Sequence, residues 1–458
     1  NQPPNPGSYS EHFGSKLLMP QYASKLYKNI DGARFEDVTI ISGLNKTSFP
    51  NAVSASDFNN DGWTDLYITN DFYSPDFLYM NNGNGSFTNI TSDALNHLSY
   101  FSMGVDVADI NNDGFQDIFV LDMAAEDNFR LKSNMSGMNP SAFWKVVNEG
   151  GHYQYMYNSL QLNNGNNTFS EIAYYSGVAK TDWSWAPLLA DFDNDGQQDL
   201  FITNGFPKDV TDRDFGDFKA TMNRFVNKQQ LIDAIPEIKS NNFIFKNKGK
   251  YQFEDKTKEW GVNFPTFSHG AAYGDLDQDG DLDLVINNMN DEAMLLQNNS
   301  ALNNYIRLKL RYKDSNIAAI GAVAKLYFTE GIQQKSILSG RGYLSQPELI
   351  AHFGLRKNQT IDSILIQWPN QKLQKVENWK INSEIEVAYE PQENDTQPKI
   401  QKQTKSPIFK QTNQDIGITY ISPEIDYIDF NFQRTIPHKF SEYGPSVSVG
   451  DINNDNLD

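Results

Sequence analysis

The sequence predicts an all-β fold, and three observations support this prediction. An acidic pattern of nine residues occurs four times, and each copy leads at once into a short apolar run such as Leu284-Val285-Ile286. An apolar run, an Asn/Gly turn and a second short run recur near these patterns, as in Leu78-Tyr79-Met80-Asn81-Asn82-Gly83, which is typical of β-hairpins. No long apolar helix interrupts them. Repeated units of short strands predict the blades of a β-propeller.

The acidic pattern carries the side chains that a calcium-binding loop needs. Positions 1, 3, 5 and 9 bear oxygen, position 6 is Gly at the sharp turn, and position 7 offers its backbone carbonyl. We therefore expect about four structural Ca²⁺ ions. The predicted ligands are Asp57, Asn59, Asp61, Trp63 and Asp65; Asp109, Asn111, Asp113, Phe115 and Asp117; Asp191, Asp193, Asp195, Gln197 and Asp199; and Asp275, Asp277, Asp279, Asp281 and Asp283.

An EF-hand is excluded by the twelfth position of each loop. An EF-hand needs a bidentate Glu there, on a helix, whereas this chain has Ile68, Val120, Ile202 and Ile286. The loops therefore feed strands. Four similar sites spread around a ring cannot share one substrate, so the predicted role of the metal is structural: it holds the entry of each strand in place.

Composition narrows the function classes. The chain has 458 residues, a net charge of -20 and no cysteine. The charge argues against nucleic acid as a partner, because phosphate binding takes a basic face. No apolar run reaches the ~20 residues of a membrane span. Loops of this kind fill readily at extracellular calcium levels, so we expect an exported protein whose signal or membrane anchor lies outside this sequence.

The four loops begin at Asp57, Asp109, Asp191 and Asp275, so the longer units carry insertions of roughly 30 residues on a basic unit of about 50. One insertion runs from about 124 to 151 and the other from about 205 to 242, where 218–235 has a helical pattern. Insertions between blades usually build the functional face of a propeller. Four units do not obviously close a ring, so further strands are expected from residues 1–25 or from upstream sequence.

The pattern changes after the fourth loop. The predicted domains are a propeller over 1–302, a small β-sandwich over 303–390, a linker over 391–406 and the start of a second propeller over 407–458. A fifth metal loop, which would hold a fifth ion, opens there with Asp451, Asn453 and Asp455, but the sequence stops before its ninth position. We expect this chain to be part of a longer protein.

These motifs resemble known families. Loops of the type Asp-Phe-Asn-Asn-Asp-Gly-Trp-Thr-Asp-Leu with Leu-Tyr-x-Asn-Asn-Gly hairpins resemble the FG-GAP or VCBS repeats of integrin-like propellers, and Gly342-Tyr343-Leu344-Ser345-Gln346, His352-Phe353-Gly354-Leu355 and Trp368-Pro369 resemble the ASPIC/UnbV domain. The arrangement is similar to large VCBS-repeat lipoproteins of Bacteroidota. This resemblance implies a place on the extracellular face of the outer membrane and, as partner, a TonB-dependent transporter, its lipoprotein partner or a glycan.

Three function classes remain open. A binding or scaffold protein, serving as an accessory subunit of an outer-membrane assembly, is favoured because the chain has no nucleophile elbow and its histidines have no metal-ligand spacing. The aromatic stretches 153–157 and 183–185 could stack on sugar rings or pack in the core. A polysaccharide-degrading enzyme would need two carboxylates about 5–10 Å apart between the insertions. An integrin-type adhesion module would need one loop with an open coordination site.

Overall fold

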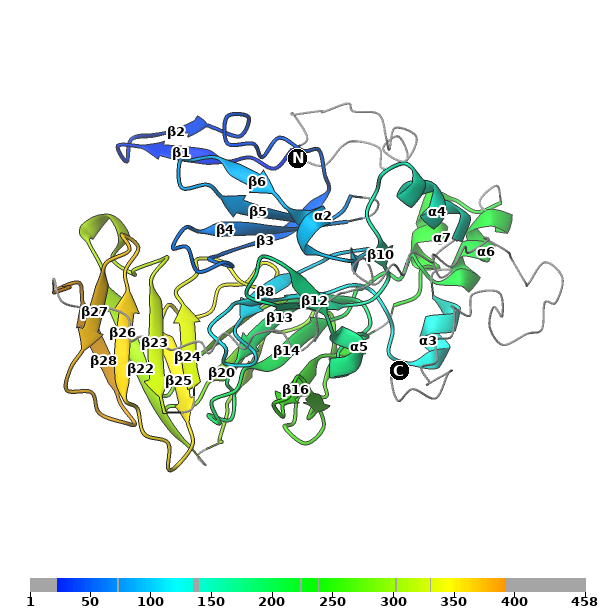
Figure 1. Cartoon of the computed structure of the whole chain (residues 1–458). Coiled ribbons are helices and arrows are strands. Elements are labelled where there is room, and N and C mark those ends of the chain that lie inside the picture. Colours follow the sequence, from blue (N-terminus) through cyan, green and yellow to red (C-terminus); the bar gives the residue numbers. More distant parts are fainter. Residues whose placement is uncertain are drawn as a thin grey trace, which may run out of the picture. The chain divides into compact units, whose positions relative to one another are not determined.

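The computed structural model describes residues 23–71, 74–134, 140–222, 225–237, 239–300, 303–329 and 331–392, and Figure 1 shows their arrangement. All described residues belong to the first of the two units into which the chain divides, residues 1–397. The predicted second propeller and its loop at Asp451, Asn453 and Asp455 lie outside the described residues. Among the described residues, no helix is both long and apolar enough to cross a membrane.

Four antiparallel sheets have the strand order expected of propeller blades, with each strand paired to the strand of the same sheet that follows it in sequence. The first sheet contains β3 (Pro50–Ser56), β4 (Asp65–Asn70), β5 (Phe77–Asn81) and β6 (Phe87–Asn89); the second β8 (Val105–Ala108), β9 (Asp117–Val120), β11 (Ser159–Asn163) and β12 (Phe169–Glu171); the third β13 (Ser184–Ala190), β14 (Asp199–Asn204), β16 (Phe243–Asn247) and β17 (Phe253–Asp255); and the fourth β19 (Ser268–Gly274), β20 (Asp283–Asn288) and β21 (Met294–Leu296).

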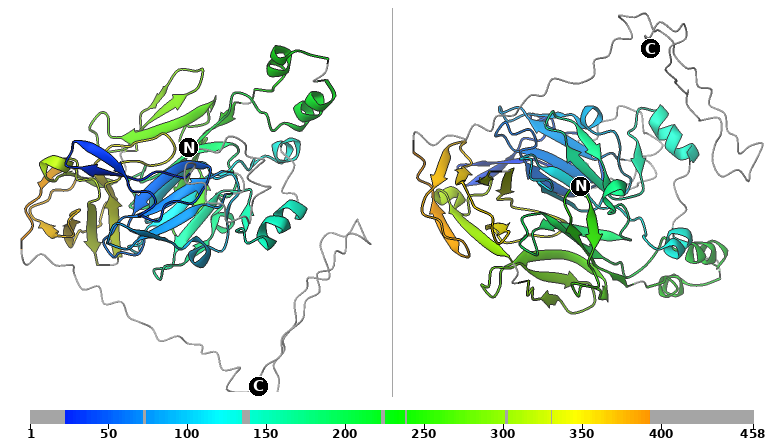
Figure 2. Two further views of the ribbon diagram at one scale, coloured as in Figure 1. Left: turned by 90° about the horizontal axis from the view of Figure 1, so that it is seen from above. Right: turned by 60° about the horizontal axis from the view of Figure 1, so that its bottom comes forward.

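The first strands of successive sheets, β3, β8, β13 and β19, contact one another in that order. Figure 2 shows the described chain from two further sides. Apolar cores fill the space between neighbouring sheets. Tyr67 and Leu78 of the first sheet pack with Val107 of the second, and Phe119 of the second packs with Leu200 of the third. The predicted all-β fold is confirmed, and its four sheets fit a propeller. Among the described residues they form an open arc, since β19 and β3 make no comparable contact.

The sandwich consists of two sheets around one core. One sheet has the order β25–β22–β28, with β22 (Asn304–Arg311), β25 (Ala351–Leu355) and β28 (Glu384–Ala388), and the other has the order β24–β23–β26–β27, with β23 (Val323–Phe328), β24 (Gly331–Ser336), β26 (Ser363–Gln367) and β27 (Leu373–Val376). Trp368 is fully buried in this core with Leu308 and Phe353. A 3₁₀ turn, η2 (Asp314–Asn316), follows β22.

The two predicted insertions carry the long helices of the described chain. The first holds α3 (Asn128–Ser133) and α4 (Pro140–Asn148), and the second holds α6 (Arg213–Met222) and α7 (Lys228–Asp233). The helical pattern expected over 218–235 corresponds to two helices, because Asn227 and Gln230 form a capping box that starts α7 separately. The remaining elements are β1 (Tyr27–Ile30), β2 (Arg34–Asp37), α2 (Thr91–Ala94), β7 (Leu98–Ser99), β10 (Gln154–Tyr155), α5 (Ala173–Ser176), β15 (Ser240–Asn241) and β18 (Pro265–Thr266).

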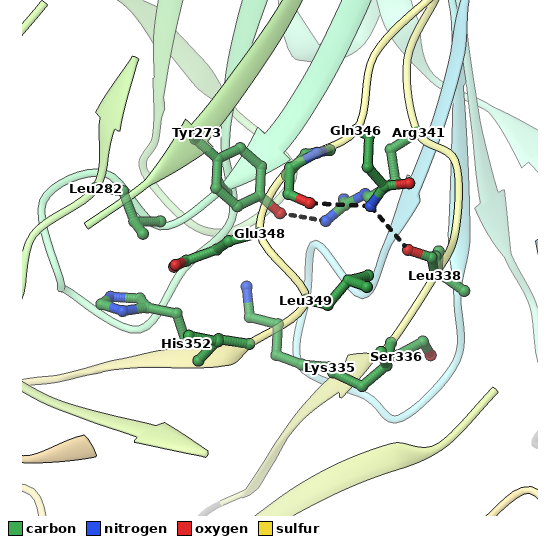
Figure 3. A pocket seen from close by; sticks show the side chains of 14 residues that line it. Tyr273, Leu282, Lys335, Ser336, Leu338, Arg341, Gln346, Glu348, Leu349 and His352 are labelled. Atoms are coloured by element: carbon green, nitrogen blue, oxygen red, sulfur yellow. Dashed lines mark hydrogen bonds between the residues drawn. The ribbon is translucent and has the colours of Figure 1, made fainter. Parts of the chain in front are cut away.

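A loop of the sandwich, residues 338–348, enters the arc and contacts the first strands of three sheets. Arg341 donates to both carboxylate oxygens of Asp106 on β8, at 2.7 Å each. Glu348 N–H donates to the carbonyl of Tyr273 on β19 at 3.2 Å, and Arg341 also donates to the carbonyl of Leu189 on β13 at 3.0 Å. Figure 3 shows Arg341 bonded to the Tyr273 hydroxyl beside a small pocket. The loop therefore joins the blades to the sandwich.

Candidate metal loops and the insertion face

All four acidic loops lie at the same end of the blades. Each connects the first and second strands of its sheet, as between β3 and β4. The loop backbone makes two left-handed turns: Asn60 at position 4 has φ 58° and Gly62 at position 6 has φ 91°, and the other three loops repeat this pair. Glycine adopts this region without steric cost and asparagine tolerates it. The structure therefore has the sharp turn at position 6, where the sequence predicted it.

The side chains at positions 1, 3 and 5 face the backbone of the loop. Asp57 accepts hydrogen bonds from the N–H groups of Asp61 at 3.2 Å and Gly62 at 2.7 Å, and Asp61 accepts from Trp63 N–H at 2.8 Å. In the third loop, one oxygen from each of the three carboxylates lies within 4.8 Å of the others, and the fourth loop repeats this grouping. The grouped residues are Asp191, Asp193 and Asp195, and Asp275, Asp277 and Asp279.

The Asp at position 9 ties the loop to the neighbouring hairpin. Asp65 accepts from Phe58 N–H at 2.9 Å with one oxygen and from Asn81 N–H at 2.8 Å with the other. Asp117, Asp199 and Asp283 make the equivalent pair of bonds. The ninth carboxylates are not part of the two grouped triplets, so in this structure their contacts are with backbone N–H groups.

Position 7 has a packing role beside its predicted carbonyl. The indole of Trp63 lies against Gly83 in the hairpin turn, where an added Cβ would be 2.8 Å from Nε1. Phe115 lies against Gly165 in the same way, with 2.9 Å to the ring. Asp281, at position 7 of the fourth loop, instead accepts from Ser300 N–H at 2.8 Å. The sequence shows an aromatic residue at position 7 and a glycine in the following hairpin in the first two blades, but the ligand spacing did not predict that the two pack together.

Burial raises the pKa of several carboxyls in the metal loops. Desolvation raises the pKa of Asp65, Asp109 and Asp191 to about 7, and it raises the pKa of Asp117 well above its usual range. Ionised carboxylates that are buried together are costly unless a cation compensates them. The donor set consists of oxygen atoms, and Oδ1 of Asp275 is buried without a hydrogen-bond partner. These observations fit a hard divalent cation such as Ca²⁺.

Asparagine side chains connect each loop to the next. Asn60 donates to the carbonyl of Gly114 at 2.8 Å, Asn112 to Gly196 at 2.9 Å and Asn194 to Gly280 at 2.9 Å. Hairpin asparagines donate in the opposite direction, with Asn163 reaching the carbonyl of Phe58 at 2.8 Å. Asn247 and Asn298 repeat this backward bond. Asn at position 4 was visible in three loops, but a spacing rule cannot show that it reaches the next blade.

The sandwich packs against the metal loops. An added Cβ on Gly354 would lie 2.1 Å from a carboxylate oxygen of Asp191, so only glycine fits there. His352 Nε2 lies 2.7 Å from Oδ1 of Asn194. Arg307, on β22, contacts Asp275 of the fourth loop at 3.1 Å and Glu348 at 3.0 Å. The sandwich therefore covers part of the third and fourth loops.

The opposite end of the blades carries both insertions, because the connection between second and third strands lies there. Arg130 of α3 binds Asp182 at 2.6 and 2.8 Å and Asp209 at 3.3 Å. Thr211 of the second insertion also donates to Asn134 of the first. The two insertions thus contact each other, and the two carboxylates at this contact, Asp182 and Asp209, are both paired with the guanidinium of Arg130. Beside them lies a small pocket lined by Met123, Leu131, Asn134, Met156, Trp183 and Thr211.

An exposed aromatic patch lies beside the first insertion. Its members are connected by ring contacts of 4.8 to 6.2 Å and comprise Phe143, Trp144, Tyr153, Tyr155, Tyr157 and Tyr174. Trp144, Tyr153 and Tyr174 are exposed at 53%, 44% and 58%. Polar groups border the rings: His97 lies 2.6 Å from the Tyr157 hydroxyl and 3.3 Å from Glu171. Of the two predicted aromatic stretches, 153–157 therefore contributes to the surface.

The second aromatic stretch packs around the inner strands. Trp185 is 9% exposed, and its ring packs at a tilt against His269, with 4.6 Å between ring centroids, and against Tyr343 of the sandwich loop, with 5.0 Å. Burial lowers the pKa of His269. His152 lies 3.0 Å from the carbonyl of Leu95. These contacts indicate packing roles for Trp185, His269 and His152.

Comparison with known families identifies two regions of the chain. The FG-GAP-like repeat matches residues 57–120 and 146–202, and the ASPIC and UnbV family matches residues 312–394. The chain is 28% identical over 363 residues to cartilage acidic protein 1 of Xenopus tropicalis, covering 77% of this chain and 47% of that protein. It is 30% identical over 122 residues to integrin alpha-3 of Mus musculus, covering 24% and 11%. The predicted resemblance to both families is confirmed.

The chain spans about half the length of the cartilage acidic proteins it matches. Among solved structures, a lectin from Agrocybe aegerita, described as recognising non-reducing terminal N-acetylglucosamine, overlaps with a TM-score of 0.33 and 14% identity, covering 61% of this chain and 58% of that chain. An overlap of this extent identifies neither a fold nor a ligand for this chain.

Proposed function

We propose a binding function for this chain, which belongs to the proteins that join FG-GAP-like repeats to an ASPIC and UnbV domain. In this proposal the protein is exported, its blades are stabilised by Ca²⁺, and it serves as a surface accessory subunit of an outer-membrane assembly. Its anchor would lie outside this sequence. The partner is a glycan or an envelope protein such as a TonB-dependent transporter or its lipoprotein partner.

The aromatic patch is the observation that carries the proposal. Large exposed aromatic side chains are depleted on surfaces without partners and enriched in binding sites. The rings of Trp144, Tyr153 and Tyr174 present flat apolar faces, and the partly exposed His97, held beside Glu171, adds a polar side chain at their border. Apolar faces beside polar groups suit sugar rings, which are apolar on their faces and polar at their edges. A glycan is therefore the ligand that this surface fits better.

Two observations disfavour the alternatives. A glycosidase needs one carboxylic acid and one carboxylate free to reach the substrate, whereas Asp182 and Asp209 are both bound to Arg130. An integrin-type site needs a cation that is open to an external carboxylate. The third and fourth metal loops contact the sandwich through Gly354 and Arg307 instead.

The test is a glycan array probed with the wild-type protein and with a variant carrying Trp144→Ala and Tyr153→Ala. We expect each glycan that binds the wild-type protein to bind the variant roughly 10- to 30-fold more weakly, since buried aromatic hot spots contribute about 1.4–2 kcal/mol. Trp63→Ala, at the opposite end of the blades, is the matched control and should bind normally. Equal glycan binding by the wild-type protein and the patch variant contradicts the proposal, and so does the release of shortened sugars from the glycans. If no glycan binds, and a purified envelope protein binds the wild-type protein but not the patch variant, the partner is a protein.

A further inference from the structure

The four metal loops fall into two classes at position 3. The first and second loops have Asn59 and Asn111 there, and each amide donates to the Asp at position 5, at 2.9 and 3.1 Å. The third and fourth loops have Asp193 and Asp277 instead. These two loops therefore have an additional carboxylate at position 3 and lack the amide N–H that bridges positions 3 and 5 in the first two.

A second position changes together with position 3. The residue before the hairpin asparagine is Met80 in the first blade and Leu162 in the second, but Lys246 in the third and Gln297 in the fourth. Lys246 contacts the carboxylates of both Asp193 and Asp195, the latter at 2.9 Å. Gln297 donates to Asp277 at 2.6 Å. The polar hairpin residue thus bonds to the additional carboxylate.

The ammonium group of Lys246 lies among the predicted calcium ligands. Asp191, Asp193 and Asp195 bring one oxygen each within 4.8 Å of the others, and the lysine bonds to two of these three side chains. Lys246 and both carboxylates are largely buried, with side-chain exposures of 19–20%, so solvent screens their interaction only in part. Lys246 therefore stands in for a metal cation at this loop.

We propose that Lys246 is a built-in cation that competes with Ca²⁺ for the third loop. This inference rests on the calcium binding proposed above and deepens it. Among the described residues, no lysine or arginine forms an ion pair with the carboxylates of the first or second loop. Calcium entering the third loop has to move the ammonium away from Asp193 and Asp195 or bind beside a positive charge. The third loop is thus held together without calcium and binds calcium more weakly than its carboxylates would otherwise allow.

The experiment compares wild-type protein with Lys246→Met, which copies the residue of the first blade. Calcium chloride is titrated into chelator-treated protein by calorimetry, and the melting temperature is measured in chelator and in calcium. We expect one site to bind calcium roughly tenfold more tightly in Lys246→Met, together with a lower melting temperature in chelator and a larger increase on adding calcium. Lys375→Met, which removes an equal charge from an exposed pair with Glu377 in the sandwich, should change neither quantity.

Two further variants keep the inference testable if Lys246→Met folds poorly. Met80→Lys places an ammonium beside the first loop and should weaken calcium binding there. Combining Lys246→Met with Asp193→Asn recreates the first class of loop and should remove the tighter site. Unchanged or weaker calcium binding by a folded Lys246→Met protein overturns the inference. Wild-type protein that binds no calcium overturns the proposed calcium stabilisation itself, so the two failures can be told apart.

Discussion

At one end of the blades, four loops of nine residues repeat the same turns and nearly the same hydrogen bonds; at the other end, two connections are short and two are long helical insertions. The repeated end is buried against neighbouring loops and against the sandwich, as the contacts of Asn112 and Gly354 show. The insertion end presents exposed rings such as Trp144. This difference suits the proposed division, in which the metal-loop end stabilises the blades and the insertion end binds the ligand.

Removing calcium should have the largest effect, because it acts on every loop at once. A ligand present at 10 to 100 times its dissociation constant stabilises by about 1.4–2.7 kcal/mol per site. We therefore expect the melting temperature to fall strongly in chelator and to recover when Ca²⁺, but not an equal ionic strength of NaCl, is restored. Differential scanning calorimetry measures this. An equal melting temperature with and without chelator would contradict the idea that the metal-loop end stabilises the blades.

The same comparison predicts a pH dependence in chelator. Burial raises the folded-state pKa of Asp65 and Asp109 from 3.8 to about 7, so between about pH 4 and 7 the folded state binds more protons than the unfolded state. Stability then falls as pH rises through this window. With calcium present, the ion replaces the protons and the decline should be smaller. Melting curves at several pH values, with and without calcium, check the sign.

Arg341→Ala should have the next largest effect. Asp106 is fully buried and receives two hydrogen bonds from Arg341, so the variant leaves a buried carboxylate without its partner, at a cost of about 3–5 kcal/mol. Urea unfolding measures this loss. Arg311→Ala is the matched control, because its pair with Glu386 is exposed and such pairs contribute about 0–1 kcal/mol. Equal losses in the two variants would show that the 338–348 loop adds nothing special.

The sequence predicted the metal loops better than the contacts around them, and the ion pairs of Arg341 and Arg130 show why. Ligand spacing within nine residues is a local property, so the turns at Gly62 and its equivalents followed from the pattern. Arg341 and Asp106 are 235 residues apart, and no local rule pairs them. The insertions were located from the spacing of the loops, but the pairing of Arg130 with Asp182 depends on how two separate segments fold against each other.

The bonds between loops should contribute less. Asn112→Gly keeps the left-handed backbone at φ 58° and removes only the bond to Gly196, so we expect a loss of about 0.5–1.5 kcal/mol in the free energy of unfolding. Asn167→Gly, at φ 66° in the turn between β11 and β12, is the control for the backbone effect. If both variants lose the same free energy, the bond to the next loop contributes nothing.

The smallest expected effect separates two exposed tryptophans of similar accessibility. Trp63, at the metal-loop end, is 48% exposed and covers Gly83, whereas Trp144, at the insertion end, is 53% exposed and contacts Phe143. Trp63→Ala uncovers the hairpin turn beside a metal loop and should cost about 1 kcal/mol. Trp144→Ala should stay within about 0.5 kcal/mol of wild type and yet lose ligand binding. Urea titrations with and without calcium resolve the difference. A Trp144→Ala protein that loses more stability than Trp63→Ala would mean that the patch packs against the body of the protein and is not a free binding surface.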